Sequence, residues 1–220
     1  MGPDLATPGV TVFDRAQLTG DSLVVARRLL GAVLEAADVR VRLVEVEAYR
    51  GADDPASHTY RGKTERNAVM FGPAGHLYVY FVYGMHFCAN VVAESDGVPG
   101  AVLLRAGEVV DGVAAARKRR PAARSDHELA KGPARLTSVL ALDREDNGLD
   151  LTDPASPVRL LTGDPVPDEQ VRTGPRVGVA SAMDVPWRLW VHGSPAVSGY
   201  RRGGKRRVNL VLPGRGQSDA

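Results

Sequence analysis

Apolar and polar residues alternate along the middle of this 220-residue chain with the period of two that is typical of β-strands. The densest stretch is 77–92, LYVYFVYGMHFCANVV, in which five aromatic residues fall within ten positions. β-Branched and aromatic residues on both sides of Gly84 predict two strands joined by a tight turn. Tyr83 would lie at the tip of this hairpin, where a large aromatic side chain has no core to enter. A plain core hairpin is the alternative interpretation.

A second, longer strand is predicted over Val39–Tyr49. Alternate residues of a strand point to the same face, which here groups Val41, Leu43, Glu45, Glu47 and Tyr49. The opposite face carries the small apolar residues Val44, Val46 and Ala48, which fit a packed core. The two glutamates would lie about 6.6–7 Å apart beside a tyrosine, an arrangement that suits a cleft. An ordinary solvated strand face is the alternative, and the spacing alone favours it.

Short helices and further strands are expected around these two elements. Helical spacing predicts a helix after Asp21, and Asp111 is expected to cap another that runs to about Arg119. Four more stretches have the composition of strands: 101–106, 158–161, 176–179 and 188–191.

The order of these elements predicts an α+β fold with one compact domain. We expect a curved, mostly antiparallel sheet flanked by short helices, with a protruding β-hairpin. The domain would span residues 1–198, of which 1–12 are expected to be loose. Residues 199–220 are rich in glycine and arginine and are expected to form a basic, partly disordered tail.

The composition is that of an ordinary globular protein, with 44% hydrophobic and 25% charged residues. No run of 18 apolar residues occurs, so we expect no transmembrane helix. Met1–Asp14 lacks the basic and apolar regions of a signal peptide, and we therefore expect a cytoplasmic protein, in bacteria one that works at the nucleoid. The single Cys88 excludes an internal disulfide and a cysteine-based metal site.

The net charge is only +2, but the basic residues are unevenly distributed. One cluster is Arg117–Arg120, and another lies near the C-terminus, over 201–207. Such clusters are typical of proteins that bind a polyanion, although solvated faces and flexible tails carry them as well.

The residues that could carry chemistry narrow the function classes. Inverting glycosidases hold two carboxylates about 6.5–9.5 Å apart, so Glu45 and Glu47 are compatible with glycoside hydrolysis but indicate it only weakly. The five histidines are scattered without the spacing of metal ligands, which argues against a metal site. Neither GxGxxG after a strand nor GxxxxGK[ST] occurs, so no local motif supports a nucleotide cofactor.

Five segments together keep the order and spacing of a known family. They are VEVEAYRGADDPASH (44–58), RNAVMFGPAGHLYVYFVYGMHFCANVV (66–92), AVLLRA (101–106), KGPARLTSVLAL (131–142) and PRVGVA (175–180). In these segments the chain closely resembles the alkyladenine DNA glycosylases, which are also called 3-methyladenine DNA glycosylases. The resemblance runs from about residue 21 to about residue 198, and the basic tail is not part of it.

This resemblance implies one mixed domain that excises alkylated and deaminated purines, such as 3-methyladenine, hypoxanthine and ethenoadenine, from DNA in base excision repair. The N-glycosidic bond is hydrolysed without a metal or organic cofactor and without a strand-cleaving lyase step. The partner would be double-stranded DNA containing damaged purines, no membrane would be involved, and we expect a monomer. The alternative is a non-catalytic protein that binds damaged DNA with the same pocket.

The resemblance also implies the reacting groups. Glu47 corresponds to the catalytic carboxylate that activates water, and Arg105 to the arginine that helps to hold this water. A buried salt bridge from Arg105 to Glu45 or Glu47 is the alternative role for the arginine. In either case Glu45 is expected to be structural.

Four residues correspond to the pocket for the flipped base. Tyr49 and His58 look like one wall and Tyr80 like the opposite wall, so that the base would stack between aromatic rings. Asn90 looks like the residue whose bulk discourages the 2-amino group of guanine. His58 alone, without the resemblance, would be read as a surface loop residue.

Two further residues correspond to the part of the family that enters DNA. Tyr83 looks like the wedge that fills the gap left by the flipped base, and Met85 matches its companion. His86 departs from the aromatic residue that the family has there. Candidate phosphate contacts are Arg117–Arg120 and the start of the helix after Gly132, each of which could equally be a solvated surface.

The pocket assignment constrains the hairpin. Tyr80 and Asn90 must share one face, which a two-residue turn does not allow. A three-residue loop over 83–85, or a bulge, puts them on the same face. We therefore predict an odd loop or a bulge.

Overall fold

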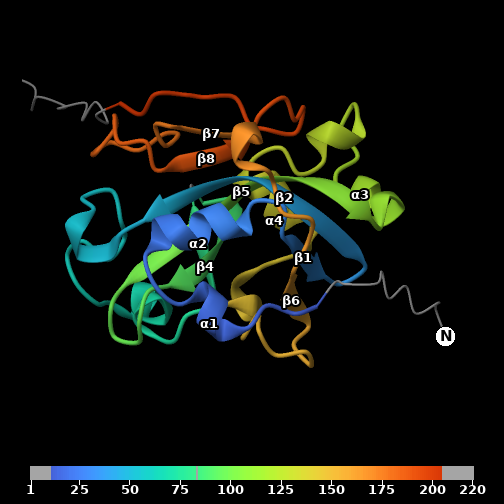
Figure 1. Ribbon diagram of the computed structural model, residues 1–220. Coiled ribbons are helices and arrows are strands. Elements are labelled where there is room, and N and C mark those ends of the chain that lie inside the picture. The colour runs from blue at the N-terminus through green and yellow to red at the C-terminus, as the bar shows by residue number, and fades with distance from the viewer. Residues whose placement is uncertain (1–10, 83, 205–220) are drawn as a thin grey trace, which may run out of the picture.

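The computed structural model describes residues 11–82 and 84–204. Within this part of the chain, eight strands form one sheet in which all neighbouring strands are antiparallel (Figure 1). The strands are β1 Val33–Ala36, β2 Val39–Tyr49, β3 Leu77–Val82, β4 His86–Ala93, β5 Gly100–Asp111, β6 Val158–Leu161, β7 Val171–Gly174 and β8 Arg188–Val191. Their order is β3-β4-β5-β2-β1-β6, and β8 pairs with both β2 and β7.

Short helices flank this sheet. The α-helices are α1 Arg15–Leu18, α2 Ser22–Leu29, α3 Val113–Arg119 and α4 Pro133–Val139. The 3₁₀ segments are η1 Gly51–Asp53, η2 Glu65–Phe71, η3 Asp126–Glu128, η4 Arg144–Asp146 and η5 Asp168–Gln170. Helix α2 packs against β2 and β5, and α4 packs against β4 and β5. The predicted α+β class is confirmed, and none of the described helices is long and apolar enough to cross a bilayer.

The two longest strands, β2 and β5, pair at the centre of the sheet and carry the residues of interest. In Figure 1, β7 and β8 lie above them, and α1 and β6 lie below. The register between β2 and β5 is irregular on both sides of Glu45, and neither Val44 nor Arg105 has a Cα partner in this ladder. Irregularities of this kind redirect side chains and are frequent next to active sites.

The hairpin of β3 and β4 has the predicted odd loop. Val82 pairs with His86, so three residues connect the two strands. In this register Tyr78 pairs with Asn90, and Tyr80 therefore lies on the same face as both. Because the pocket assignment depended on that shared face, the confirmed loop length agrees with it.

Two local predictions are wrong. Asp111 does not cap α3: it is the last residue of β5, and Gly112 precedes the helix with a left-handed φ of 73°. The stretch 176–179 is not a strand. Its side chains and backbone are engaged elsewhere, since Arg176 pairs with Asp54 and Val177 donates its N–H to Glu47.

The ends of the predicted domain are only partly visible. Most of the stretch expected to be loose, residues 1–10, lies outside the described residues, as does the tail from residue 205 onward.

Candidate active site

Two glutamates on β2 are the centre of the site. The side chains of Glu45 and Glu47 are fully buried, so the alternative of a solvated strand face is wrong. Arg105 on β5 contacts both: its Nε lies 3.1 Å from Oε1 of Glu45, and its Nη1 lies 3.5 Å from Oε1 of Glu47. One guanidinium therefore lies between two carboxylates, in a place where their charges are poorly screened by water.

Glu45 is held by several donors and has the surroundings of a structural residue. Arg188 on β8 donates from Nε over 2.6 Å to Oε1 of Glu45. Ser198 donates its backbone N–H to Oε2 over 2.7 Å and its hydroxyl to Oε1 over 3.0 Å. Both carboxylate oxygens are thereby occupied, which agrees with the expectation that Glu45 positions other groups.

Glu47 has fewer partners and borders a groove. The backbone N–H of Val177 donates to its Oε1 over 2.7 Å, and the Tyr49 hydroxyl donates to its Oε2 over 3.1 Å. Burial raises the pKa of Glu47 above its ordinary value, while the Arg105 charge opposes this shift. The result is a buried carboxylate with a raised proton affinity, facing a groove that is also lined by Arg105. That is the environment of a general base.

An aromatic pocket adjoins this groove. Its lining residues are Tyr49, Ala56, Ser57, His58, Met70, Tyr78, Tyr80 and Asn90. Tyr49, His58 and Tyr80 also line the groove, so the two hollows share a wall. The rings of Tyr78 and Tyr80 are stacked with centroids 5.4 Å apart. The structure thus brings together all four residues that the sequence assigned to base binding.

The predicted walls of the pocket touch each other in this structure. The His58 ring meets the Tyr80 ring edge-on, with centroids 4.5 Å apart. On its other side, Nδ1 of His58 lies 3.1 Å from the Tyr78 hydroxyl. Burial, followed by the nearby Arg66 charge, lowers the pKa of His58. The lowered pKa favours the neutral form of the imidazole.

The ring of Tyr49 packs against Arg176, which forms a buried ion pair with Asp54 that the sequence did not predict. The Arg176 guanidinium lies 4.5 Å from the Tyr49 ring centroid and 5.0 Å from that of Trp187. Asp54 accepts two hydrogen bonds from this guanidinium, of 2.5 and 2.8 Å, and both side chains are fully buried. The ring of Tyr49 is thereby fixed in place.

Asn90 is one of the residues that line the pocket. It is buried, and its Nδ2 donates to the backbone oxygen of Tyr78 over 3.1 Å. This bond fixes the orientation of the amide, so its bulk is a permanent feature of the pocket.

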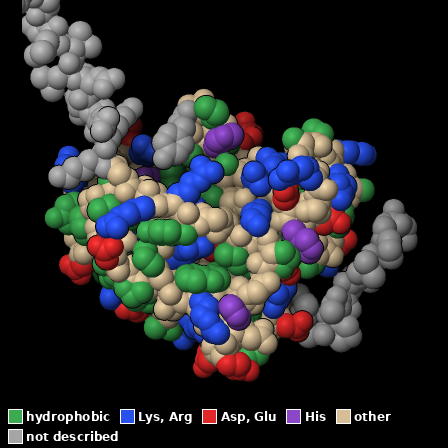
Figure 2. All heavy atoms as spheres, turned by 90° about the horizontal axis from the view of Figure 1, so that it is seen from above, with side chains coloured by type: hydrophobic (Ala, Val, Ile, Leu, Met, Phe, Trp, Pro, Cys, Tyr) green, Lys and Arg blue, Asp and Glu red, His purple; other side chains and the backbone are tan. Residues whose placement is uncertain are grey.

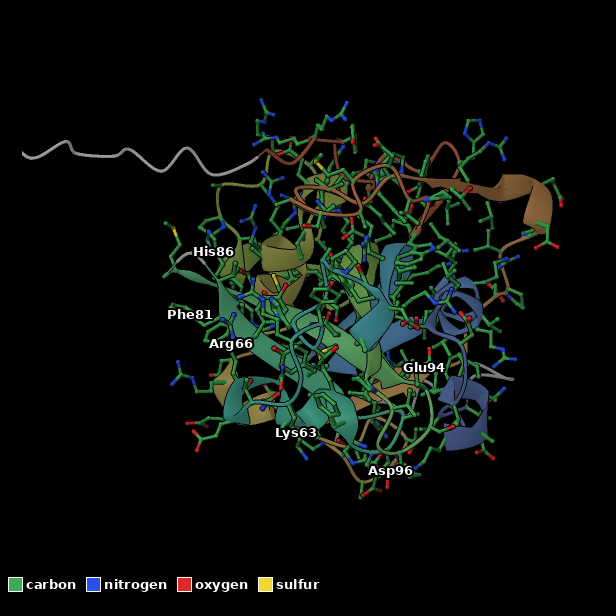
Figure 3. The ribbon with its side chains drawn as sticks, turned by 90° about the vertical axis from the view of Figure 1, so that its left-hand side faces the viewer. Lys63, Arg66, Phe81, His86, Glu94 and Asp96 are labelled. Carbon is green, nitrogen blue, oxygen red and sulfur yellow. The ribbon has the colours of Figure 1, made fainter. Side chains whose placement is uncertain are left out.

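The tip of the hairpin is apolar and exposed. Met85 is 68% exposed and Phe81 39%. Figure 3 shows Phe81, His86 and Arg66 together at this end, away from Glu94 and Asp96. Arg66 donates to the backbone oxygen of Phe81 over 3.3 Å. Tyr83, the expected wedge, lies outside the described residues.

Two of the four residues in the cluster Arg117–Arg120 form ion pairs within the described part of the chain. Arg117 contacts Asp126 at 2.7 Å, and Arg119 contacts Asp38. These pairs weaken the case for the cluster as a phosphate site.

The start of the helix after Gly132 remains a candidate phosphate contact, because Pro133, the first residue of α4, lines the groove. Figure 2 shows that Lys and Arg side chains lie over the middle of the upper face of the molecule, and that most acidic side chains lie toward its edges.

The described residues offer no obvious metal site. Over 11–82 and 84–204, no group of three or more His, Cys, Asp and Glu side chains could hold a metal ion.

A buried carboxylate beside an aromatic pocket is the arrangement expected of an enzyme that hydrolyses a bond to a flat, aromatic group. The chain belongs to the methylpurine-DNA glycosylase family, whose sequence model matches residues 16–195. It is 57% identical to a protein of Nocardia farcinica over 198 residues, which cover 88% of this chain and 93% of the relative. It is 50% identical to one of Streptomyces avermitilis over 209 residues, with 92% and 98% covered. Both relatives bear the name "Putative 3-methyladenine DNA glycosylase". The family assignment makes DNA the partner and hydrolysis of N-glycosidic bonds the reaction.

Proposed function

We propose that this protein is a monofunctional glycosylase that flips alkylated or deaminated purines out of double-stranded DNA and removes them hydrolytically. The substrates would be bases of the 3-methyladenine, hypoxanthine and ethenoadenine type. The observation that carries this proposal is the fully buried Glu47 at the border between a groove and an aromatic pocket. Residues 1–198 would act as one domain and as a monomer.

In the proposed mechanism Glu47 is the general base. The bond between sugar and base breaks through a transition state with oxocarbenium character, and the carboxylate both stabilises this positive charge and takes a proton from water. Arg105 has two tasks. Its charge opposes the rise in the pKa of Glu47 and so favours the ionised carboxylate, and its guanidinium would hold the water.

The pocket would bind the flipped purine by stacking. Tyr49 and Tyr80 would face the two sides of the base, and each stack contributes on the order of 1–3 kcal/mol. Asn90, fixed by its bond to Tyr78, would collide with the 2-amino group of guanine. A cationic alkylated purine gains additional attraction from the ring faces.

His58 would donate a hydrogen bond to the base. With the Tyr78 hydroxyl as donor to Nδ1, the proton of the neutral imidazole sits on Nε2. Nε2 can then donate to an acceptor on the base, such as the oxygen of hypoxanthine. This supports deaminated purines as substrates in addition to alkylated ones.

The hairpin tip would fill the space that the flipped base leaves. Flipping costs a few kcal/mol of stacking and pairing, and an inserted apolar side chain offsets part of this cost. The proposed wedge is Tyr83, with the exposed Met85, two positions later in the chain, as its companion.

A single-turnover assay for free base tests the proposal. Duplexes that carry hypoxanthine, ethenoadenine or 3-methyladenine are incubated with the wild type, with Glu47→Gln, and with the surface control Glu128→Gln. We expect release of base by the wild type and the control, and binding without release by Glu47→Gln. Full release by Glu47→Gln would disprove the role of Glu47. No release by any variant over the whole panel would favour a protein that only binds damaged DNA.

A further inference from the structure

The C-terminal segment Gly199–Gly204 lies against the loop that holds Glu47. The N–H of Gly178 donates to the backbone oxygen of Arg201 over 3.0 Å. Gly203 approaches the same loop so closely that a Cβ at this position would lie 1.8 Å from the backbone oxygen of Val179. The segment is therefore docked on the loop, although it falls beyond the residues that the family model matches.

The docking begins at the buried carboxylate network. Ser198, the residue before this segment, donates two hydrogen bonds to Glu45. From there the chain runs along the loop 177–181, which lines the groove beside Glu47. The segment is thus held at its start by the hydrogen bonds of Ser198 and further along by the contacts of Arg201 and Gly203 with the loop.

Arg201 lines the groove, together with Glu47 and Arg105. Its side chain is exposed, and within the described part of the chain it forms no ion pair. The neighbouring Arg202 differs in this respect, since it lies 3.6 Å from Asp184 and does not line the groove. Arg201 therefore presents an uncompensated positive charge at the place where the DNA strand must pass.

We propose that Arg201 binds a phosphate of the DNA backbone beside the flipped nucleotide, which makes the C-terminal segment part of the DNA-binding groove. This inference rests on the proposed function. A guanidinium can donate two parallel hydrogen bonds to a phosphate, and phosphate contacts of this kind set the position of a protein on the duplex without reading sequence. The Arg201 contact would hold the strand while the base occupies the aromatic pocket.

Salt-dependent binding of a lesion duplex tests this inference. The dissociation constant for a hypoxanthine-containing duplex is measured by fluorescence anisotropy at several salt concentrations. All proteins carry Glu47→Gln, so that the base is not released. They are compared with and without Arg201→Gln, Arg201→Lys and the matched control Arg202→Gln. We expect Arg201→Gln to weaken binding by roughly 3- to 10-fold and to reduce the salt slope by about 1.

Each outcome bears on the inference. Arg201→Lys keeps the charge and should retain most of the salt slope, and Arg202→Gln should change neither slope nor affinity. Equal slopes for Arg201→Gln and Arg202→Gln would overturn the proposed phosphate contact. A protein that binds the duplex with the expected slope but releases no base when Glu47 is present would instead contradict the proposed function.

Discussion

Val177 donates its backbone N–H to Oε1 of Glu47 over 2.7 Å, so a loop residue 130 positions away holds the carboxylate of the proposed general base. The same loop contacts the C-terminal segment through Gly178 and Val179. The geometry of Glu47 therefore depends on how closely that segment can approach.

Gly203→Ala is expected to slow base release. The added Cβ would collide with the backbone oxygen of Val179 and displace the loop, which weakens the bond from Val177 to Glu47. A hydrogen bond to a charged group contributes about 1.5–3 kcal/mol, so we expect a loss of roughly tenfold or more in the single-turnover rate constant. The matched control is Gly199→Ala, since a Cβ there meets nothing within 4 Å. Equal rates for the two variants would show that the segment does not position the loop.

The rate of base release should fall at acidic pH. A general base must be ionised, and burial raises the pKa of Glu47 above its ordinary value. For an alkylated purine that already carries a positive charge, the single-turnover rate constant should therefore decrease as the pH drops through this raised pKa. Arg105→Met removes the charge that opposes the rise, so it should move this decrease to higher pH. A profile that does not move in Arg105→Met would contradict the coupling.

Glu47→Gln is expected to be at least as stable as the wild type near pH 7.5. A carboxyl whose pKa is raised in the folded state binds its proton more tightly there than in the unfolded chain. Its stabilising contribution is complete below the ordinary pKa and is lost as the pH rises through the raised pKa. Ionisation of Glu47 above its ordinary pKa therefore carries a cost that glutamine does not have. Melting temperatures of both proteins at pH 7.5 and at pH 4 check this, and the advantage of the variant should shrink at the lower pH.

Much of this site could be predicted from local sequence patterns, because strands fix which side chains share a face. The period of two in β2 places Glu45 and Glu47 on one face. The family resemblance requires Tyr80 and Asn90 to share a face, and the same period then predicts an odd loop or a bulge in the hairpin. Both are properties of chain segments shorter than about 16 residues.

The supporting ion pairs could not be predicted in this way. Asp54 and Arg176 are 122 positions apart, and Glu45 and Arg188 are 143 apart. No local periodicity links such residues. The stretch 176–179 is predicted as a strand, whereas in the structure the backbone N–H of Val177 donates to Glu47. The spacing of Glu45 and Glu47 alone favours a solvated face, so the need of two buried carboxylates for several donors becomes visible only in the structure.

Arg188→Met should strongly destabilise the fold. The side chains of Arg188 and Glu45 are 6% and 0% exposed, and removal of Arg188 leaves the buried Glu45 with Arg105, which it shares with Glu47, as its remaining cation. The expected loss is about 3–5 kcal/mol in the free energy of unfolding. The same substitution at Arg124, whose side chain is 87% exposed in its pair with Glu128, should cost much less, because water screens that pair. Urea unfolding of both variants measures the difference, and similar losses would show that burial of the Arg188 pair has no special effect.

Met85→Ala should weaken binding to a lesion duplex without affecting the fold. Met85 is 68% exposed at the hairpin tip, so its truncation removes little packing from the free protein. On DNA the same side chain would be buried against the bases that flank the gap, and loss of about 1 kcal/mol of apolar burial corresponds to roughly fivefold weaker binding. Fluorescence anisotropy with Glu47→Gln as the background gives the dissociation constants, and thermal unfolding checks the fold. Val110→Ala is the control, since Val110 is 51% exposed on β5 and away from the hairpin. If Met85→Ala and Val110→Ala bind equally well, the hairpin tip does not enter the duplex at this residue.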